Sequence, residues 1–155
     1  HQSEQKQIQR QITGLSKDEI NPDRAKNMRA ALAEESLIAY LIRNPDRAKP
    51  VHDLLLPEQF CTSFNRGVYE KLTKWLLEGR QVSLSDFAEY YSVEEMGRIA
   101  QMLAKSAQTP NLLQAEHDYV AVITEEHNKP TVQQAAQSSD EDLLRYMEQL
   151  RTQKQ

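Results

Sequence analysis

Residues 34–46 read Glu-Glu-Ser-Leu-Ile-Ala-Tyr-Leu-Ile-Arg-Asn-Pro-Asp, residues 55–60 read Leu-Leu-Pro-Glu-Gln-Phe, and residues 64–78 read Phe-Asn-Arg-Gly-Val-Tyr-Glu-Lys-Leu-Thr-Lys-Trp-Leu-Leu-Glu. In this order they predict a helix that stops at Asn44-Pro45, a tight turn that buries Phe60, and a second helix. The second helix is amphipathic, because its apolar residues recur at helical spacing on one face. No residue type in the stretch is placed to do chemistry. The pattern therefore favours a docking module over an enzyme.

The composition predicts one all-α domain, with or without an appendage. The chain has 155 residues, only four of them glycine, and its β-branched residues do not alternate with polar ones. No apolar run approaches the ~20 residues that a membrane-spanning helix needs, so we expect a soluble protein. The single cysteine, Cys61, excludes an internal disulfide framework and suits a reducing compartment.

Charge is distributed unevenly along the chain. Residues 111–155 hold four basic and eight acidic side chains, whereas residues 1–44 hold seven basic and six acidic ones. A nucleic-acid-binding protein normally presents a basic face, because neutralising phosphates dominates its affinity. The acidic last third therefore disfavours strong, direct DNA binding.

Three segments are predicted. Residues 1–20 are rich in Gln and contain Gly14, and we expect them to form a flexible tether. Residues 21–108 hold five or six helices and form a helical bundle. The predicted helix starts within it include Ser63, Ser83 with Asp86, and the capping box Ser92 with Glu95, and Gly79 is expected to end the helix that Ser63 begins. Residues 109–155 form a long connecting helix, which Pro130 must kink or end, and a C-terminal helical hairpin. This pair of helices is too poor in apolar residues to make a core of its own, so it needs another surface to pack on.

One short repeat is present. Asn-Pro-Asp-Arg-Ala-Lys occurs at residues 21–26 and again at 44–49, but the residues that follow differ. A repeat architecture would need the following residues to match as well. We interpret the two copies as the same helix-start sequence used twice.

The residue types that could do chemistry have simpler explanations. His117 and His127 lie ten positions apart with no cysteine near them, which does not fit a zinc site. Glu116, His117 and Asp118 are sequence neighbours that point in different directions on a helix, so surface polarity explains them. Trp75 and the pair Tyr90-Tyr91 could stack on bases, but core packing is the favoured interpretation. We expect no catalytic residue, no cofactor and no metal.

The chain resembles the C-terminal helicase-binding domain of bacterial DNA primase. The likeness rests on residues 33–38 and 44–46, the Leu-Pro-Glu-Gln-Phe turn at 56–60, Phe-Asn-Arg-Gly-Val-Tyr-Glu at 64–70, residues 87–88 and 92–96, and Leu-Leu-Arg-Tyr-Met-Glu-Gln-Leu at 143–150. The resemblance implies a helical bundle joined by a long helix to a helical hairpin. It also implies a non-enzymatic domain, monomeric on its own, that binds the N-terminal domains of the hexameric replicative helicase and couples primer synthesis to replication.

We expect the hairpin to supply the affinity for the helicase through a few apolar anchors with charged neighbours. The predicted partner-binding residues are Tyr119, Val120, Ile123, Arg145, Tyr146, Met147, Leu150 and Arg151. Two alternatives remain open. The N-terminal domain of the replicative helicase shares the bundle fold and a similar helix–turn–Phe–helix pattern. A small regulator could instead bind nucleic acid through the basic residues of the lead-in.

Overall fold

The computed structural model describes residues 18–106 and 113–130, which form five α-helices, four short 3₁₀ helices and no strand. The all-α prediction is confirmed. The α-helices are α2 (Met28–Arg43), α3 (Ala48–Leu54), α4 (Ser63–Leu77), α5 (Val93–Ser106) and α6 (Leu113–Asn128). The 3₁₀ helices are η2 (Ala25–Asn27), η3 (Pro45–Arg47), η4 (Pro57–Gln59) and η5 (Leu84–Phe87).

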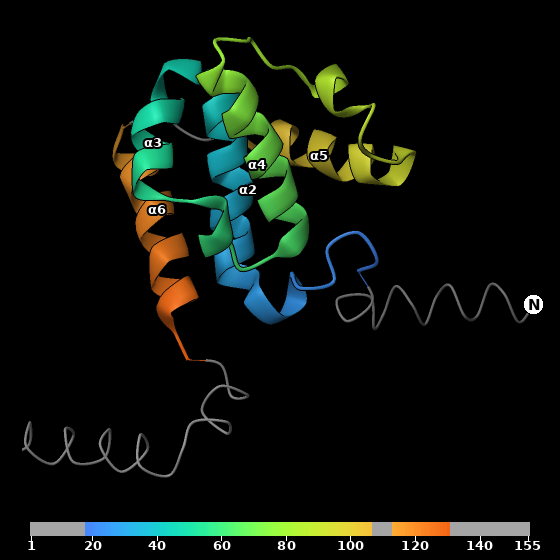
Figure 1. Cartoon of the computed structure of the whole chain (residues 1–155). Helices are drawn as coiled ribbons and strands as arrows, with labels where there is room; N and C mark the ends of the chain where they lie inside the picture. Colours follow the sequence, from blue (N-terminus) through green and yellow to red (C-terminus); the bar gives the residue numbers. More distant parts are fainter. Residues whose placement is uncertain (1–17, 107–112, 131–155) are drawn as a thin grey trace, which may run out of the picture.

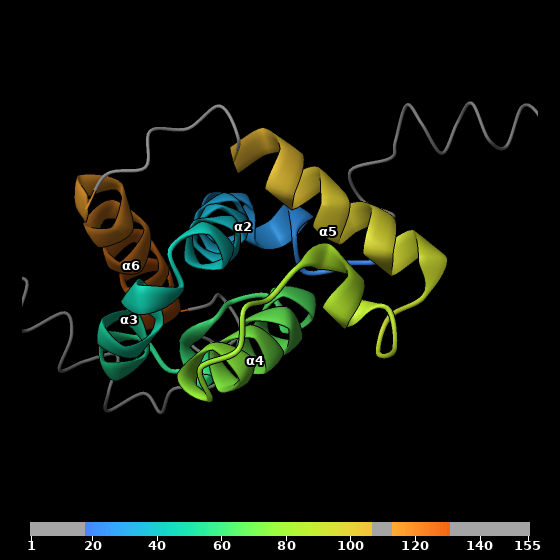
Figure 2. The same cartoon turned by 90° about the horizontal axis from the view of Figure 1, so that it is seen from above.

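Helix α2 lies at the centre of the bundle. Helices α6, α5 and α4 all pack against it, and α3 packs against α4 (Figure 1). Seen from above, α6 and α5 lie on opposite sides of α2 (Figure 2). A helix with neighbours on several sides must be apolar around most of its circumference. In α2 the residues that meet this need are mainly alanine and branched aliphatic: Ala30, Ala31, Ala33, Leu37, Ile38, Ala39 and Leu41 are all buried.

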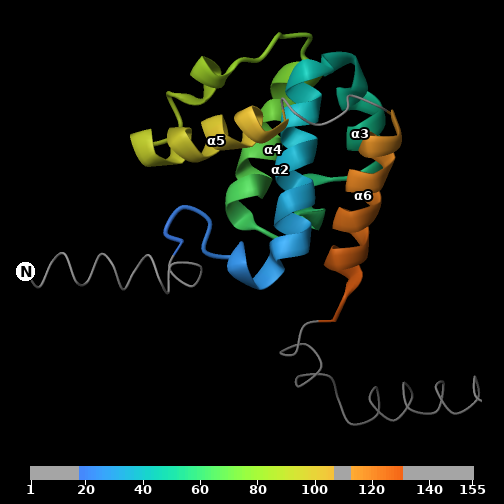
Figure 3. The same cartoon turned by 180° about the vertical axis from the view of Figure 1, so that it is seen from behind.

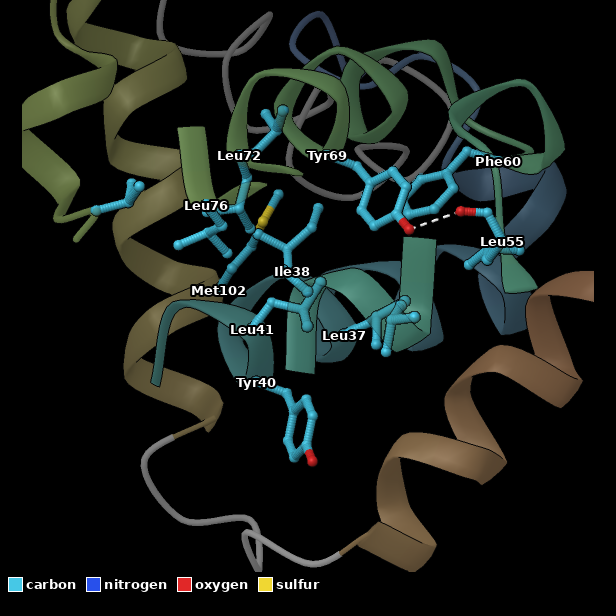
Figure 4. Close-up of a cluster of buried hydrophobic side chains, with 14 of the residues drawn as sticks. Leu37, Ile38, Tyr40, Leu41, Leu55, Phe60, Tyr69, Leu72, Leu76 and Met102 are labelled. Carbon is cyan, nitrogen blue, oxygen red and sulfur yellow. Dashed lines mark hydrogen bonds between the residues drawn. The ribbon is translucent and has the colours of Figure 1, made fainter. Parts of the chain in front are cut away.

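The predicted turn at Phe60 brings α3 and α4 together. Phe60 is 1% exposed and stacks on Tyr69 of α4, with ring centroids 4.3 Å apart. The Tyr69 hydroxyl donates a hydrogen bond of 2.7 Å to the backbone carbonyl oxygen of Leu55, as Figure 4 shows. Both groups are buried, so this bond satisfies an otherwise unpaired carbonyl at the end of α3.

Local sequence signals set several helix ends. Helix α2 ends at Arg43, directly before Asn44-Pro45, as predicted. Ser92 and Glu95 form the expected reciprocal capping box, in which Ser92 N–H donates to Glu95 Oε1 and Glu95 N–H donates to Ser92 Oγ. Ser83 and Asp86, which were predicted to start a short helix, form a second capping box at the start of η5.

Helix α6 belongs to the packed bundle in the described residues. Ile123 is fully buried in the core, and Tyr119, Val120 and Val122 pack against that core. The helix ends at Asn128, two residues before Pro130, which fits the expectation that this proline ends or kinks a helix. The predicted hairpin and all but the last three residues of the predicted tether lie outside the described residues, so the three-segment division stays a prediction.

Candidate interaction surface

Three glutamates, Glu34, Glu35 and Glu116, are buried in the bundle, and all three serve its architecture. Glu34 of α2 is fully buried. Its carboxylate accepts hydrogen bonds from the Cys61 N–H at 2.6 Å, the Thr62 hydroxyl at 2.7 Å and the Asn65 amide at 3.1 Å. Burial raises the pKa of Glu34, and the hydrogen bonds oppose that rise. Since these donors all come from the start of α4, Glu34 anchors that helix end to α2.

A second carboxylate completes the same helix end. Ser63 was expected to cap α4, but Thr62 is the N-cap residue and its hydroxyl donates to Glu34 instead. Asp23 accepts hydrogen bonds from both the N–H and the hydroxyl of Ser63, each 3.1 Å long. Negative charge near a helix N-terminus is favourable, because the first N–H groups have no partner within the helix.

Glu116 is also a buried carboxylate, and its placement contradicts the expected surface position. It is 2% exposed. Arg47 binds it through Nε at 2.7 Å and Nη2 at 2.9 Å, and the Tyr40 hydroxyl donates to it at 3.2 Å. The hydrogen bonds from Arg47 hold the pKa of Glu116 below its usual range despite burial. This cluster fixes the start of α6 to α2 and η3.

The repeated hexapeptide uses its arginine in the same way twice. Arg24, in the first copy, makes a paired contact with Glu35, with Nε 2.8 Å and Nη2 3.3 Å from the two carboxylate oxygens. Arg47, in the second copy, binds Glu116 in the same two-point geometry. Both copies lie at 3₁₀ turns that precede an α-helix, which agrees with the helix-start interpretation.

The described residues contain no group of three or more His, Cys, Asp or Glu side chains that could hold a metal ion. Burial raises the pKa of the Cys61 thiol to about 11, which keeps it protonated and unreactive at neutral pH. No helix within residues 18–106 or 113–130 is long and apolar enough to cross a membrane.

The predicted partner-binding residues divide into three groups. Ile123 is buried in the core, so it stabilises α6 rather than facing solvent. Tyr119 and Val120 are half-buried against the core and keep part of their surface exposed. The remaining five residues, Arg145, Tyr146, Met147, Leu150 and Arg151, lie outside the described residues. Their assignment stays a prediction.

A different surface gathers the residue types that dominate protein interfaces. We call it the Trp75–Tyr90 surface; it consists of Lys71, Trp75, Arg80, Tyr90 and Tyr91. The Tyr90 ring lies 5.8 Å from the Trp75 ring, and Tyr90 remains 56% exposed. The Lys71 ammonium lies 5.0 Å from the Tyr91 ring centre and 5.8 Å from that of Tyr90.

The turn after α4 positions the arginine of this surface. Gly79 has a φ of 84°. Its N–H donates a hydrogen bond to the backbone carbonyl oxygen of Leu76, and the N–H of Arg80 donates one to the backbone carbonyl oxygen of Trp75. These are the two hydrogen bonds of a Schellman motif, which favours glycine because of the positive φ. The motif folds Arg80 back so that its guanidinium lies 5.1 Å from the Trp75 ring centre. Arg80 also pairs with Asp86 at 3.5 Å.

The composition of the Trp75–Tyr90 surface suits protein recognition. Tyr, Trp and Arg are enriched among the residues that carry binding energy in interfaces. Beyond it, Val93 at the start of α5 is 85% exposed. Trp75, Tyr90 and Tyr91 were expected to pack in the core. That holds for Trp75, at 7% exposed, but Tyr90 faces solvent.

Comparison with known families agrees with this bundle. A model of the DnaB-like helicase N-terminal domain matches residues 27–125, which contain all five described α-helices except the last turn of α6. The chain belongs to the family of DnaB-like helicase N-terminal domains. No curated protein and no solved structure matches it significantly.

The resemblance to the primase helicase-binding domain was therefore wrong as an identification, and the alternative kept beside it is supported. The reason lies in where the matching residues are. Leu37, Ile38, Phe60, Val68 and Tyr69 are all at most 1% exposed. Such buried residues are determined by the packing of the bundle, and the primase domain and the helicase N-terminal domain were expected to share that bundle. They carry no information on which side of the helicase–primase contact the domain stands.

Proposed function

We propose that this domain is a non-catalytic docking part of a DnaB-like replicative helicase and that its partner is a primase. The family match is the observation that carries the proposal. In DnaB this domain is non-catalytic and binds primase. The partner assignment is thus the reverse of the one expected from the sequence, in which the helicase was the partner.

The Trp75–Tyr90 surface supports the docking role. Tyr90 combines a large exposed ring with a rigid support, because it packs beside the buried Trp75. A ring held in this way loses little conformational freedom when a partner covers it. Lys71 and Arg80 flank the rings with positive charge, which would orient a partner carrying acidic groups.

The test is complex formation with the primase from the same organism, measured by size-exclusion chromatography and isothermal titration calorimetry on the full chain. Tyr90→Ala is expected to weaken binding at least tenfold, about 1.4 kcal/mol, with the helical circular dichroism unchanged. Leu54→Ala is the matched control, because Leu54 is a 62% exposed apolar side chain at the end of α3. We expect it to bind as the wild type does.

Two results would each overturn a different part of the proposal, the first its partner and the second its binding surface. A wild-type chain that forms no complex with the primase at micromolar concentrations would refute the partner. A complex that Tyr90→Ala leaves intact while Leu54→Ala weakens it would keep the docking role and place it on the α3 side of the bundle.

A further inference from the structure

A second feature of the bundle is a small groove between α5 and the segment that leads into α2. Figure 3 shows α5 crossing above this segment. The groove has a volume of about 140 Å³ and is lined by Arg24, Glu35, Arg98, Gln101, Met102 and Lys105. We call it the α5 groove.

One wall of the groove is a row of hydrogen-bond donors. Arg98, Gln101 and Lys105 are three and then four residues apart on α5, which places them on one face of the helix. Met102 lies beside them and is 3% exposed, so its side chain forms an apolar floor. Lys105 is exposed and makes no ion pair with any residue in the described part of the chain.

Two carboxylates, Glu35 in the lining of the groove and Asp18 beside it, are already engaged with arginines. Glu35 is held by Arg24 at 2.8 Å, and Asp18 lies 2.8 Å from Arg98 Nη1. The three positive charges of Arg24, Arg98 and Lys105 are balanced by only these two negative charges, so the groove has an excess of one positive charge. This excess stands out in a chain whose net charge is −4.

The size of the groove restricts what could enter it. Sites for nucleotides and other small molecules usually measure about 300–1,000 Å³, so a volume of about 140 Å³ fits a single side chain. Nucleic acid is a poor match, because its binding relies on neutralising many phosphates and on aromatic rings that stack on bases. The groove has one excess charge and no aromatic residue in its lining.

We infer that the α5 groove receives a carboxylate side chain from an acidic segment of a protein partner. The carboxylate would accept hydrogen bonds from Arg98 and Gln101, with Lys105 adding charge at the outer end and Met102 contacting the methylene carbons. This inference rests on the proposed docking function and extends it, because it adds a charge-selective contact to the aromatic one. The partner segment is recognised by its Asp or Glu residues.

The probe for the test is a blocked hexaglutamate peptide, titrated into the isotopically labelled full chain and followed by nuclear magnetic resonance. Hexaglutamine is the uncharged control peptide, and a twelve-nucleotide oligothymidylate tests the nucleic-acid alternative. We expect hexaglutamate to shift the side-chain resonances of Arg98 and Gln101, and hexaglutamine to leave them unchanged. Oligothymidylate is expected to bind more weakly than hexaglutamate.

Two charge reversals separate a specific site from a general charge effect. Lys105→Glu is expected to weaken hexaglutamate binding at least tenfold. Lys74→Glu changes the net charge equally at an exposed position on α4, outside the groove, and is expected to have less than a twofold effect. Equal losses in the two variants, no shift at Arg98 and Gln101 with millimolar peptide, or tighter binding of oligothymidylate would each overturn the inference.

The same variants distinguish failure of this inference from failure of the proposed function. If primase binds the wild type and Lys105→Glu equally well and hexaglutamate does not bind, the groove proposal falls while the docking function stands. If hexaglutamate binds at the groove but primase forms no complex, the assigned partner falls while the chemistry of the groove stands.

Discussion

Replacing Glu116 with Gln should destabilise the bundle by about 2–4 kcal/mol. The substitution keeps the size of the side chain but removes the charge that Arg47 binds at two points, at 2.7 and 2.9 Å. Breaking a buried ion pair by removing one partner costs about 3–5 kcal/mol. Arg47 has 31% of its side chain exposed, so water partly solvates the guanidinium that is left behind, and the expected loss lies about 1 kcal/mol below that range.

The assay is urea denaturation at pH 7, followed by far-ultraviolet circular dichroism and by the fluorescence of Trp75. Glu125→Gln is the matched control on the same helix. Glu125 lies 3.3 Å from Arg29, but their side chains are 58% and 52% exposed. An exposed ion pair of this kind contributes at most about 1 kcal/mol, so we expect a loss below 0.5 kcal/mol.

A double-mutant cycle with Arg47→Met isolates the pair itself. If the ion pair is the cause, the double variant should lose less stability than the two single variants added together, by about 1–3 kcal/mol. A loss from Glu116→Gln no larger than that from Glu125→Gln would refute the reasoning. It would mean that the buried carboxylate and its arginine are no better held than a surface pair.

Three further results are expected. Tyr69→Phe should lower the free energy of unfolding by about 1–2 kcal/mol, since it leaves the buried Leu55 carbonyl without its donor; urea denaturation measures this, and no change would contradict it. Gly97→Ala should stabilise α5 by about 0.5–1 kcal/mol, because an added Cβ meets nothing within 4 Å. Gly79→Ala should destabilise the protein, because the φ of Gly79 is 84°. Thermal melts should therefore show a higher melting temperature for the first variant and a lower one for the second. Folding lowers the pKa of Glu116 below its ordinary value of 4.5, so its ionised form stabilises the fold above pH 4.5, and this stabilisation is lost as the pH falls through the folded-state pKa. Below pH 4.5 the free energy of unfolding should therefore fall more steeply for the wild type than for Glu116→Gln. Parallel plots of that free energy against pH would refute this.

Local signals in the sequence predicted much of the fold because they act over one or two helical turns. Asn44-Pro45 ends α2, and the residues Ser92 and Glu95 cap α5. The Leu-Pro-Glu-Gln-Phe turn buries Phe60. Each outcome depends on backbone geometry and on neighbours close in sequence, which a periodicity analysis can represent.

The candidate surface was only partly predictable. Trp75, Tyr90 and Tyr91 stood out in the sequence but were assigned to the core, since an apolar ring has the same periodicity whether a neighbour covers it or not. Gly79 was recognised as the end of α4. The return of Arg80 onto Trp75 follows from the Schellman motif at that glycine, and this signal could have been extracted from the sequence.

By itself, the sequence determined that this protein is all-α, where most of its helices begin and end, and which aromatic residues support its core. Only the tertiary structure decided that Glu34 and Glu116 are buried, because their partners lie 27 to 31 residues away for Glu34 and 69 to 76 residues away for Glu116. A carboxylate can be buried only where donors converge on it. That convergence depends on how α2, α4 and α6 pack together, and no local pattern records it.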